Sequence, residues 1–286
     1  MSHGFRGRAK TLINRALAQL NLQLTGLTAQ RRENQRLRDL AQSGYFDRPA
    51  FPMPPALEAM DATPVFLGLE EYLPRFADFA DDTRNDVGFS LANSYFSSPD
   101  AEVLYTIVRR FQPARIVEIG SGNSTRVSRQ AILDGALSTR LMCVDPCPRT
   151  DVSRSADEVF LRPAEDLIDD DVFRSLTSGD ILFVDSSHEL RPGNDCVALF
   201  LRLLPMLPSG ILIHVHDIFL PYDYPPWWME EGLGCSEQYI IQAMLMAEVF
   251  DVLWASQYLL HSDQRLSKLL PRAAAHNAAS LWVQKR

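Results

Sequence analysis

The spacing of apolar residues divides the chain into parts of different periodicity. Residues 10 to about 43 are predicted to form a helix, with an apolar face of Leu12, Ile13, Ala16, Leu17 and Leu20 followed by a polar, Arg-rich second half. From about residue 100, short apolar runs alternate with helical stretches, a pattern typical of parallel strands joined by crossover helices. In between, five prolines within residues 48–64 interrupt regular structure and indicate a linker.

The second part predicts an α/β fold. We expect strands at 115–119, 141–144, 159–161, 181–184, 210–214, 251–254 and 280–284, with helices at 101–111, 125–135, 195–204 and 237–249. Together they predict a Rossmann-like seven-stranded, mostly parallel sheet with an antiparallel last strand, preceded by an N-terminal helical extension. We therefore divide the chain into a basic N-terminal helical segment (1–47), a Pro-rich linker and cap region (48–89) and a main domain (90–286).

Composition and charge narrow the classes of partner. With 286 residues, 46% hydrophobic and 22% charged, the chain has an ordinary globular composition. Residues 1–50 hold nine basic and three acidic side chains, so the net charge of -8 divides into +6 there and -14 over the remainder. An acidic main domain argues against nucleic acid as the partner. The basic helix could contact anionic lipid or an acidic partner, pack on another subunit or remain solvated.

Cysteine spacing and hydropathy bear on the cellular compartment. The four cysteines form neither a CxxC pair nor a repeated zinc-ligand spacing, which predicts reduced thiols in a cytoplasmic protein. No stretch approaches 18 consecutive apolar residues, so we expect no membrane-spanning helix.

A glycine turn follows the first expected strand, in the segment from Glu118 through Gly120 and Gly122. Such a turn lets a ligand approach the backbone closely and exposes amide groups at a helix start. A dinucleotide fingerprint would have a third small residue where Thr125 stands, which disfavours a nicotinamide cofactor. Asp145 closes the next strand and could accept hydrogen bonds from a ribose diol, or it could cap the loop before Pro146.

Two further strand ends carry acids and histidines. Asp185 and His188 follow one strand, and His216 and Asp217 end the next; the carboxyl ends of neighbouring parallel strands meet at one edge of a sheet. His188 or His216 could act as a general base. The set Asp185, His216 and Asp217 offers oxygen and nitrogen ligands to a divalent metal. We expect His214 to face the opposite side and pack under a helix.

In this order and spacing, the chain resembles the class I S-adenosylmethionine-dependent methyltransferases, and among them the bacterial small-molecule O-methyltransferases. The resemblance covers roughly residues 90–286 and rests on the turn at 118–124, Asp145, the strand end at 183–188 and the segment 210–217. It implies that the main domain is a methyltransferase domain that binds S-adenosylmethionine.

The resemblance also implies where the cofactor would lie. Its contacts would run from the amino-acid end to the adenine, with Glu118 at the ammonium, Gly120 and Gly122 leaving room, Ser124 at the carboxylate, Asp145 at the ribose and Glu165 at the adenine. Glu165 could equally be an ordinary acid at a helix start.

The predicted reaction is methyl transfer to a hydroxyl, or with less support an amine, of a small metabolite. His188, His216 and Asp217 are the candidate catalytic residues, with or without a divalent metal. The aromatic loop at 218–228 could wall the acceptor pocket or simply clamp itself onto the domain. Two alternatives remain: a nicotinamide-dependent oxidoreductase, and a catalytically silent subunit that binds a partner, another copy or a peripheral surface through its basic helix.

Overall fold

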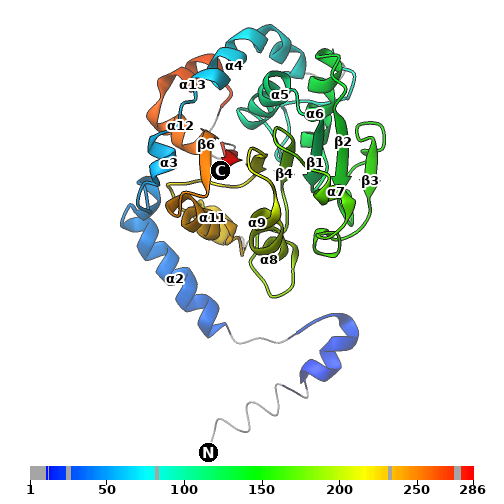
Figure 1. Ribbon diagram of the computed structural model, residues 1–286. Helices are drawn as coiled ribbons and strands as arrows, with labels where there is room; N and C mark the ends of the chain where they lie inside the picture. Colours follow the sequence, from blue (N-terminus) through cyan, green and yellow to red (C-terminus); the bar gives the residue numbers. More distant parts are fainter. Residues whose placement is uncertain (1–10, 12, 24–26, 81–83, 231–233, 274–277) are drawn as a thin grey trace, which may run out of the picture. The chain divides into compact units, whose positions relative to one another are not determined.

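The structure is a computed structural model that describes residues 11, 13–23, 27–80, 84–230, 234–273 and 278–286 (Figure 1). The chain divides into two compact units, Met1–Tyr45 and Phe46–Arg286, each of which is described by itself. The division at residues 47 and 89 stays a prediction.

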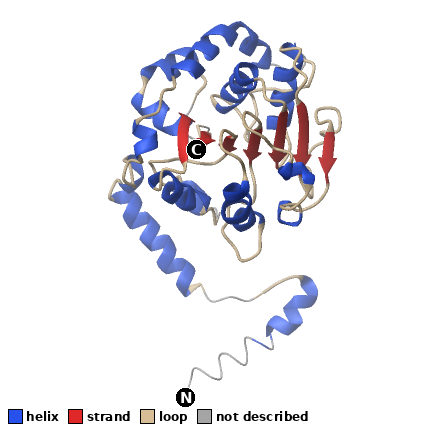
Figure 2. Ribbon diagram, in the orientation of Figure 1, coloured by secondary structure: helices blue, strands red, loops and turns tan. Residues whose placement is uncertain are grey.

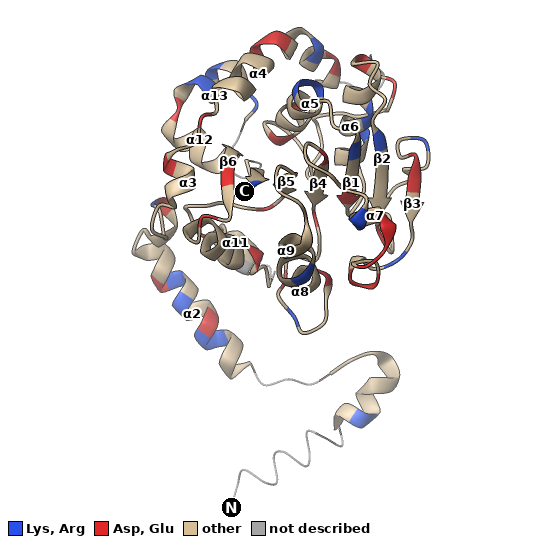
Figure 3. Cartoon of the chain, in the orientation of Figure 1, with Lys and Arg blue, Asp and Glu red and all other residues tan. Residues whose placement is uncertain are grey.

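In its described residues, the N-terminal unit contains two helical stretches instead of the single predicted helix. Residues 13–17 are helical and continue into the short helix η1 (Ala18–Leu20), which ends at Asn21 with φ of 54°. Helix α2 (Thr28–Gln42) follows and carries most of the unit's arginines (Figure 3). The prediction of one continuous helix over 10–43 is therefore wrong, because a left-handed residue cannot continue a right-handed helix. Leu12 lies outside the described residues.

The second unit is built on a seven-stranded sheet among the described residues, in the order β3-β2-β1-β4-β5-β7-β6 (Figure 2). Strand β7 pairs antiparallel with both neighbours, and the other pairings are parallel. This confirms the predicted fold class. The strands are β1 (Arg115–Ile119), β2 (Arg140–Val144), β3 (Glu158–Phe160), β4 (Ile181–Val184), β5 (Leu212–Val215), β6 (Phe250–Ala255) and β7 (Leu281–Lys285).

Helices cover both faces of this sheet (Figure 1). Alternate strand residues point to opposite faces, so that Ile116 and Phe183 join one apolar cluster while Val117 and Val184 join another. The first cluster includes residues of α4 (Thr63–Phe76), α5 (Asp100–Phe111), α6 (Asn123–Asp134), α12 (Ser256–Ser262) and α13 (Gln264–Leu269). The second includes residues of α3 (Pro55–Glu58), α7 (Asp171–Arg174), α8 (Asp195–Ala198), the π-helical segment η6 (Leu199–Leu203), α9 (Leu204–Met206) and α11 (Glu237–Met246).

Part of the region expected to be a linker is helical core. Pro64 lies in the first turn of α4, where a proline costs no hydrogen bond, and Phe66 and Leu69 of this helix are buried. None of the helices in the described ranges is both long and apolar enough to cross a membrane. All four cysteines are free thiols.

Candidate active site

The turn after β1 brings the first strand against the end of β4. Gly120 has φ of 79°, and a Cβ added to it would lie 2.2 Å from the backbone oxygen of Asp185. Only glycine fits this close approach in a left-handed conformation. A Cβ added to Gly122 would meet no protein atom within 4 Å, so the space beside this residue is open. The two glycines therefore serve different purposes: one closes the turn on β4, and the other leaves room for a ligand.

Glu118 lies at the base of this turn with 1% of its surface exposed. The hydroxyl of Ser124 donates to its Oε1, and the thiol of Cys143 lies 3.7 Å from its Oε2. Burial raises the pKa of Glu118 to about 8, although these neighbours partly oppose the shift. Ser124 thus holds the buried side chain of Glu118 in place at the end of β1, directly before the glycine turn.

Asp145 follows β2 and is tied to the glycine turn. Its Oδ2 accepts a hydrogen bond of 2.7 Å from the hydroxyl of Ser121, and its Oδ1 accepts one of 2.8 Å from the amide of Cys147. The loop-capping alternative is therefore realised, while a carboxylate keeps capacity for further donors. Glu165 lies in η5 (Ala164–Asp166), half-buried, and makes no hydrogen bond or ion pair with another described residue.

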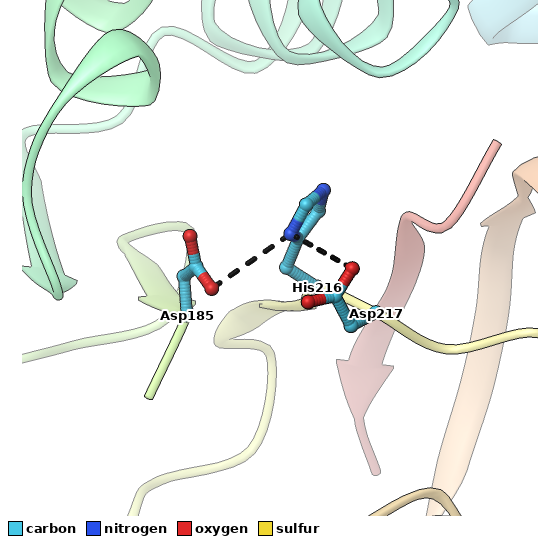
Figure 4. A group of neighbouring side chains, drawn as sticks. All are labelled: Asp185, His216 and Asp217. Carbon is cyan, nitrogen blue, oxygen red and sulfur yellow. Dashed lines mark ion pairs between the residues drawn. The ribbon is translucent and has the colours of Figure 1, made fainter. Parts of the chain in front are cut away.

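The ends of β4 and β5 bring Asp185, His216 and Asp217 together (Figure 4). His216 lies between two carboxylates, with its Nδ1 3.7 Å from Asp185 Oδ1 and 3.4 Å from Asp217 Oδ1. One ligand atom from each of these three residues lies within 4.8 Å of the others, a spacing that suits a divalent metal. His188 joins the group, because its Nε2 is 3.3 Å from Asp185 Oδ1 and 3.4 Å from Asp217 Oδ2.

Electrostatics in this cluster favour charged imidazoles. Burial lowers the pKa of His188, but the charge of Glu237 and a hydrogen bond to Asp185 outweigh it and hold the pKa well above its ordinary value. Burial likewise opposes the charge on His216, while Asp217 and its other carboxylate neighbours raise its pKa well above the usual range. The cluster therefore holds its positive charges as protons, which an incoming cation would compete to displace.

Two residues of the cluster have an uncommon backbone conformation. His188 and Asp217 adopt φ of 62° and 60°, in the left-handed region that residues with a Cβ enter in only a few per cent of cases, although histidine and aspartate do so more often than most. Strained backbone that survives folding often serves a site. The conformation places both side chains at the rim, beyond the ends of the strands that carry them.

His214 is a packing residue, as expected, but on the other face from the one predicted. It is fully buried, its ring stacks on Phe183 at 3.9 Å between centroids, and its Nε2 is 2.8 Å from the hydroxyl of Ser280. Its ring lies on the same side of the sheet as His216, with centroids 5.8 Å apart, because residues two apart on a strand share a face. Burial lowers its pKa well below the ordinary value.

Two buried acids that sequence analysis missed contact the cluster from helix starts. Glu237 begins α11 and Asp100 begins α5, and neither is exposed to solvent. Glu237 Oε1 is 2.5 Å from Nδ1 of His188, while Asp100 Oδ2 is 3.6 Å from Nε2 of His216. An acid in the first turn of a helix is so common that the sequence offers no signal to distinguish these two.

The aromatic loop clamps itself onto the domain. Phe219, Tyr224 and Trp228 pack together with Ala279 into a separate buried cluster, in which the rings of Tyr224 and Trp228 stack 5.8 Å apart. These three side chains are therefore core, and of the two alternatives the structure supports the clamp.

A cavity of about 490 Å³ lies beside the segment that leads into α5. The ring of Phe96 in this segment lies 5.2 Å from the ring of His216, so the same stretch of chain borders the cavity and the histidine cluster. Among the described residues, Arg272 is the one basic side chain of the lining, and it makes no ion pair with another of them. The lining consists of Leu91, Ala92, Asn93, Ser94, Ser97, Ser98 and Arg272.

Comparison with known proteins identifies the central region. Residues 117–218 match a family model described as a methyltransferase domain, which confirms the predicted enzyme class. This match spans the glycine turn, Asp145 and the ends of β4 and β5. No curated protein matches the chain.

Several solved structures are similar at low identity. An SAH-bound methyltransferase of Podospora anserina, PaMTH1, is 19% identical, with 88% of this chain and 97% of that one covered at a TM-score of 0.42. An O-methyltransferase of Bacillus cereus in complex with SAH is 15% identical, with 77% and 91% covered at a TM-score of 0.40. Such values are too low to assign a ligand or a substrate to this chain.

Proposed function

We propose that this chain, which carries a methyltransferase domain over residues 117–218, transfers the methyl group of S-adenosylmethionine to a hydroxyl group of a small metabolite. One observation carries the proposal: the glycine turn that would receive the donor abuts the strand end that bears the histidine and acid cluster. The 2.2 Å separation between a Cβ at Gly120 and the oxygen of Asp185 measures how closely they meet. A donor lying across the turn would present its methyl group beside the cluster.

On the donor side, the buried carboxylate of Glu118 would bind the ammonium group of S-adenosylmethionine. The open space at Gly122 would let the donor lie close to the backbone of the glycine turn. Asp145 would accept from the ribose hydroxyls with the lone pairs that Ser121 and Cys147 leave available. Ser124 would act by orienting Glu118. Glu165, in η5 after β3, would face the adenine.

On the acceptor side, the cluster favours a hydroxyl over an amine. A neutral amine attacks a methyl group without help, whereas a hydroxyl needs its proton removed as the bond forms. His188 or His216 would take that proton, because the sulfonium charge of the bound donor lowers the pKa of a nearby imidazolium and frees a ring nitrogen. The cavity beside the Phe96 segment, which Arg272 helps to line, has the volume of a site for a small polar molecule.

Asp185, His216 and Asp217 fit a divalent metal. Ligand atoms about 2.0–2.2 Å from one ion lie no more than about 4.4 Å apart, and the observed upper limit of 4.8 Å is close to that. A metal held there would lower the pKa of the acceptor hydroxyl. His188 and its neighbours would still orient the acceptor and receive the proton.

Calorimetric titration with S-adenosylmethionine and S-adenosylhomocysteine tests the proposal first. We expect binding in the micromolar range, and then a mass gain of one methyl group in hydroxylated metabolites screened by mass spectrometry. No binding of either compound at millimolar concentration would refute the proposal. Oxidation of a reduced nicotinamide cofactor would favour the oxidoreductase alternative, and donor binding without any methylated product would favour the silent subunit.

The binding partners and the cellular location of the chain remain predictions. The acidic second unit argues against nucleic acid. Contact with another copy or a peripheral surface would use the basic N-terminal segment, and a cytoplasmic location would agree with the four free thiols.

A further inference from the structure

The ion pair between Glu237 and His188 is supported by two hydrogen bonds of the preceding residue, Ser236. The amide of Ser236 donates to the carbonyl of His188 at 2.7 Å, and the hydroxyl of Ser236 accepts from the amide of Leu190 at 2.8 Å. The start of α11 is thus attached to the backbone at His188 and at Leu190, two residues further on. This attachment brings the Glu237 carboxylate to 2.5 Å from the ring, the shortest separation between a histidine and an acid in the cluster.

The contact determines which edge of the ring faces the strand ends. His188 meets Glu237 through Nδ1, so its Nε2 is directed to Asp185 and Asp217, at 3.3 and 3.4 Å. Rotation of the ring by half a turn would leave the fully buried Glu237 carboxylate without its donor. An uncompensated buried charge costs several kcal/mol, so the observed orientation is strongly preferred.

Asp100 provides an internal contrast on the other histidine. Its Oδ2 is 3.6 Å from His216, which is beyond hydrogen-bond distance. Its two oxygens instead accept from the hydroxyl of Ser256 at 2.6 Å and the amide of Ala279 at 2.8 Å. Asp100 therefore joins α5 to the starts of α12 and β7, and its main role is structural. Among the described residues, Glu237 has no comparable backbone donor; its partners there are His188 and the thiol of Cys196 at 3.9 Å.

We infer that Glu237 is a positioning residue that accepts the Nδ1 proton of His188 and so holds Nε2 toward the place where the acceptor hydroxyl would lie. The inference rests on the proposed function for the direction of the reaction, but the hydrogen bond itself does not. A charged acceptor makes this bond about twice as strong as a neutral one would. Glu237 touches neither donor nor acceptor in this arrangement; it acts through the imidazole.

Proton NMR of the full chain labelled with ¹⁵N-histidine tests the bond without any methyl acceptor. We expect one Nδ1 proton far downfield of the amide region, lost in His188→Asn. In Glu237→Gln it should move upfield, because an amide oxygen is the weaker acceptor, and Glu237→Asp should restore part of the shift if glutamine impairs folding. Asp100→Asn is the matched control: it removes a buried carboxylate of the same cluster and should leave this resonance in place while lowering the melting temperature.

Binding and turnover separate this inference from the proposed function. Glu237→Gln should bind S-adenosylhomocysteine within about twofold of the wild type, while kcat with an acceptor from the metabolite screen falls about 10- to 100-fold and KM for the donor is unchanged. A wild-type spectrum without the downfield proton, an unchanged resonance in Glu237→Gln, or an unchanged kcat would overturn the inference. If the resonance behaves as expected but no donor binds, the proposed function fails and the hydrogen bond stands.

Discussion

Gly122→Ala tests where the donor lies. The added Cβ meets no protein atom within 4 Å, so the free energy of unfolding should stay within about 1 kcal/mol of the wild type. If the donor fills that space, the methyl group overpacks the contact at a cost of about 1–3 kcal/mol. This corresponds to a dissociation constant about 5- to 150-fold higher. Calorimetry with S-adenosylhomocysteine measures it, and differential scanning fluorimetry reports the melting temperature.

Gly120→Ala is the matched control, because it should fail in the opposite way. Its Cβ would lie 2.2 Å from the oxygen of Asp185, so the turn must move by roughly 1 Å to reach an ordinary contact. The left-handed φ of 79° adds about 1–2 kcal/mol for a residue with a Cβ. With about 1–3 kcal/mol for the overpacked contact, we expect a melting temperature about 4–20 °C lower.

The pair refutes the reasoning if its members behave alike. Gly122→Ala with wild-type affinity would mean that the donor does not occupy the open side of the turn. Gly120→Ala with wild-type stability would mean that β1 and β4 are not in such close contact. We expect Gly122→Ala to be a stable protein that binds S-adenosylhomocysteine weakly, and Gly120→Ala to be an unstable protein.

Three further predictions concern charge. Burial raises the pKa of Glu118 to about 8, so most of it is protonated at pH 7 and binding of the donor ammonium should release a proton. The affinity for the donor should therefore rise as the pH approaches 8. Calorimetry in phosphate and in Tris measures the proton release, which Glu118→Gln should abolish. Mn²⁺, followed by water-proton relaxation, should bind to the wild type and at least tenfold more weakly to Asp217→Asn. If neither protein changes the relaxation rate, the three residues do not form a metal site. Arg272→Ala should raise KM for an anionic acceptor about tenfold with little change in kcat, and equal effects on a neutral acceptor would contradict an ion pair.

Strand positions were accessible from sequence because apolar runs in a parallel sheet are nearly continuous. Strand β4 occupies the predicted residues 181–184, and β1 the predicted 115–119. Helix α4 was missed because Pro64 was counted with the prolines that indicated a linker, although it lies in the first turn, where helices accept proline.

In the candidate site too, residues that follow predicted strands could be identified from the sequence, whereas roles that depend on distant contacts could not. Asp185, His188, His216 and Asp217 were predictable as a group, because neighbouring strands must end at one edge and the chain places polar residues directly after each apolar run. The role of Ser124 was not, since only the structure places its hydroxyl on Glu118 instead of on open solvent.

The buried acids explain why sequence patterns stop short of the chemistry. Glu237 and Asp100 are each the first residue of a helix, far along the chain from the histidine they approach, and nothing local separates them from the many acids that merely face a helix dipole. Their distances of 2.5 and 3.6 Å differ because one has only the imidazole to satisfy it and the other has two donors of its own. Which acid acts through a histidine and which holds the fold is thus decided by tertiary packing.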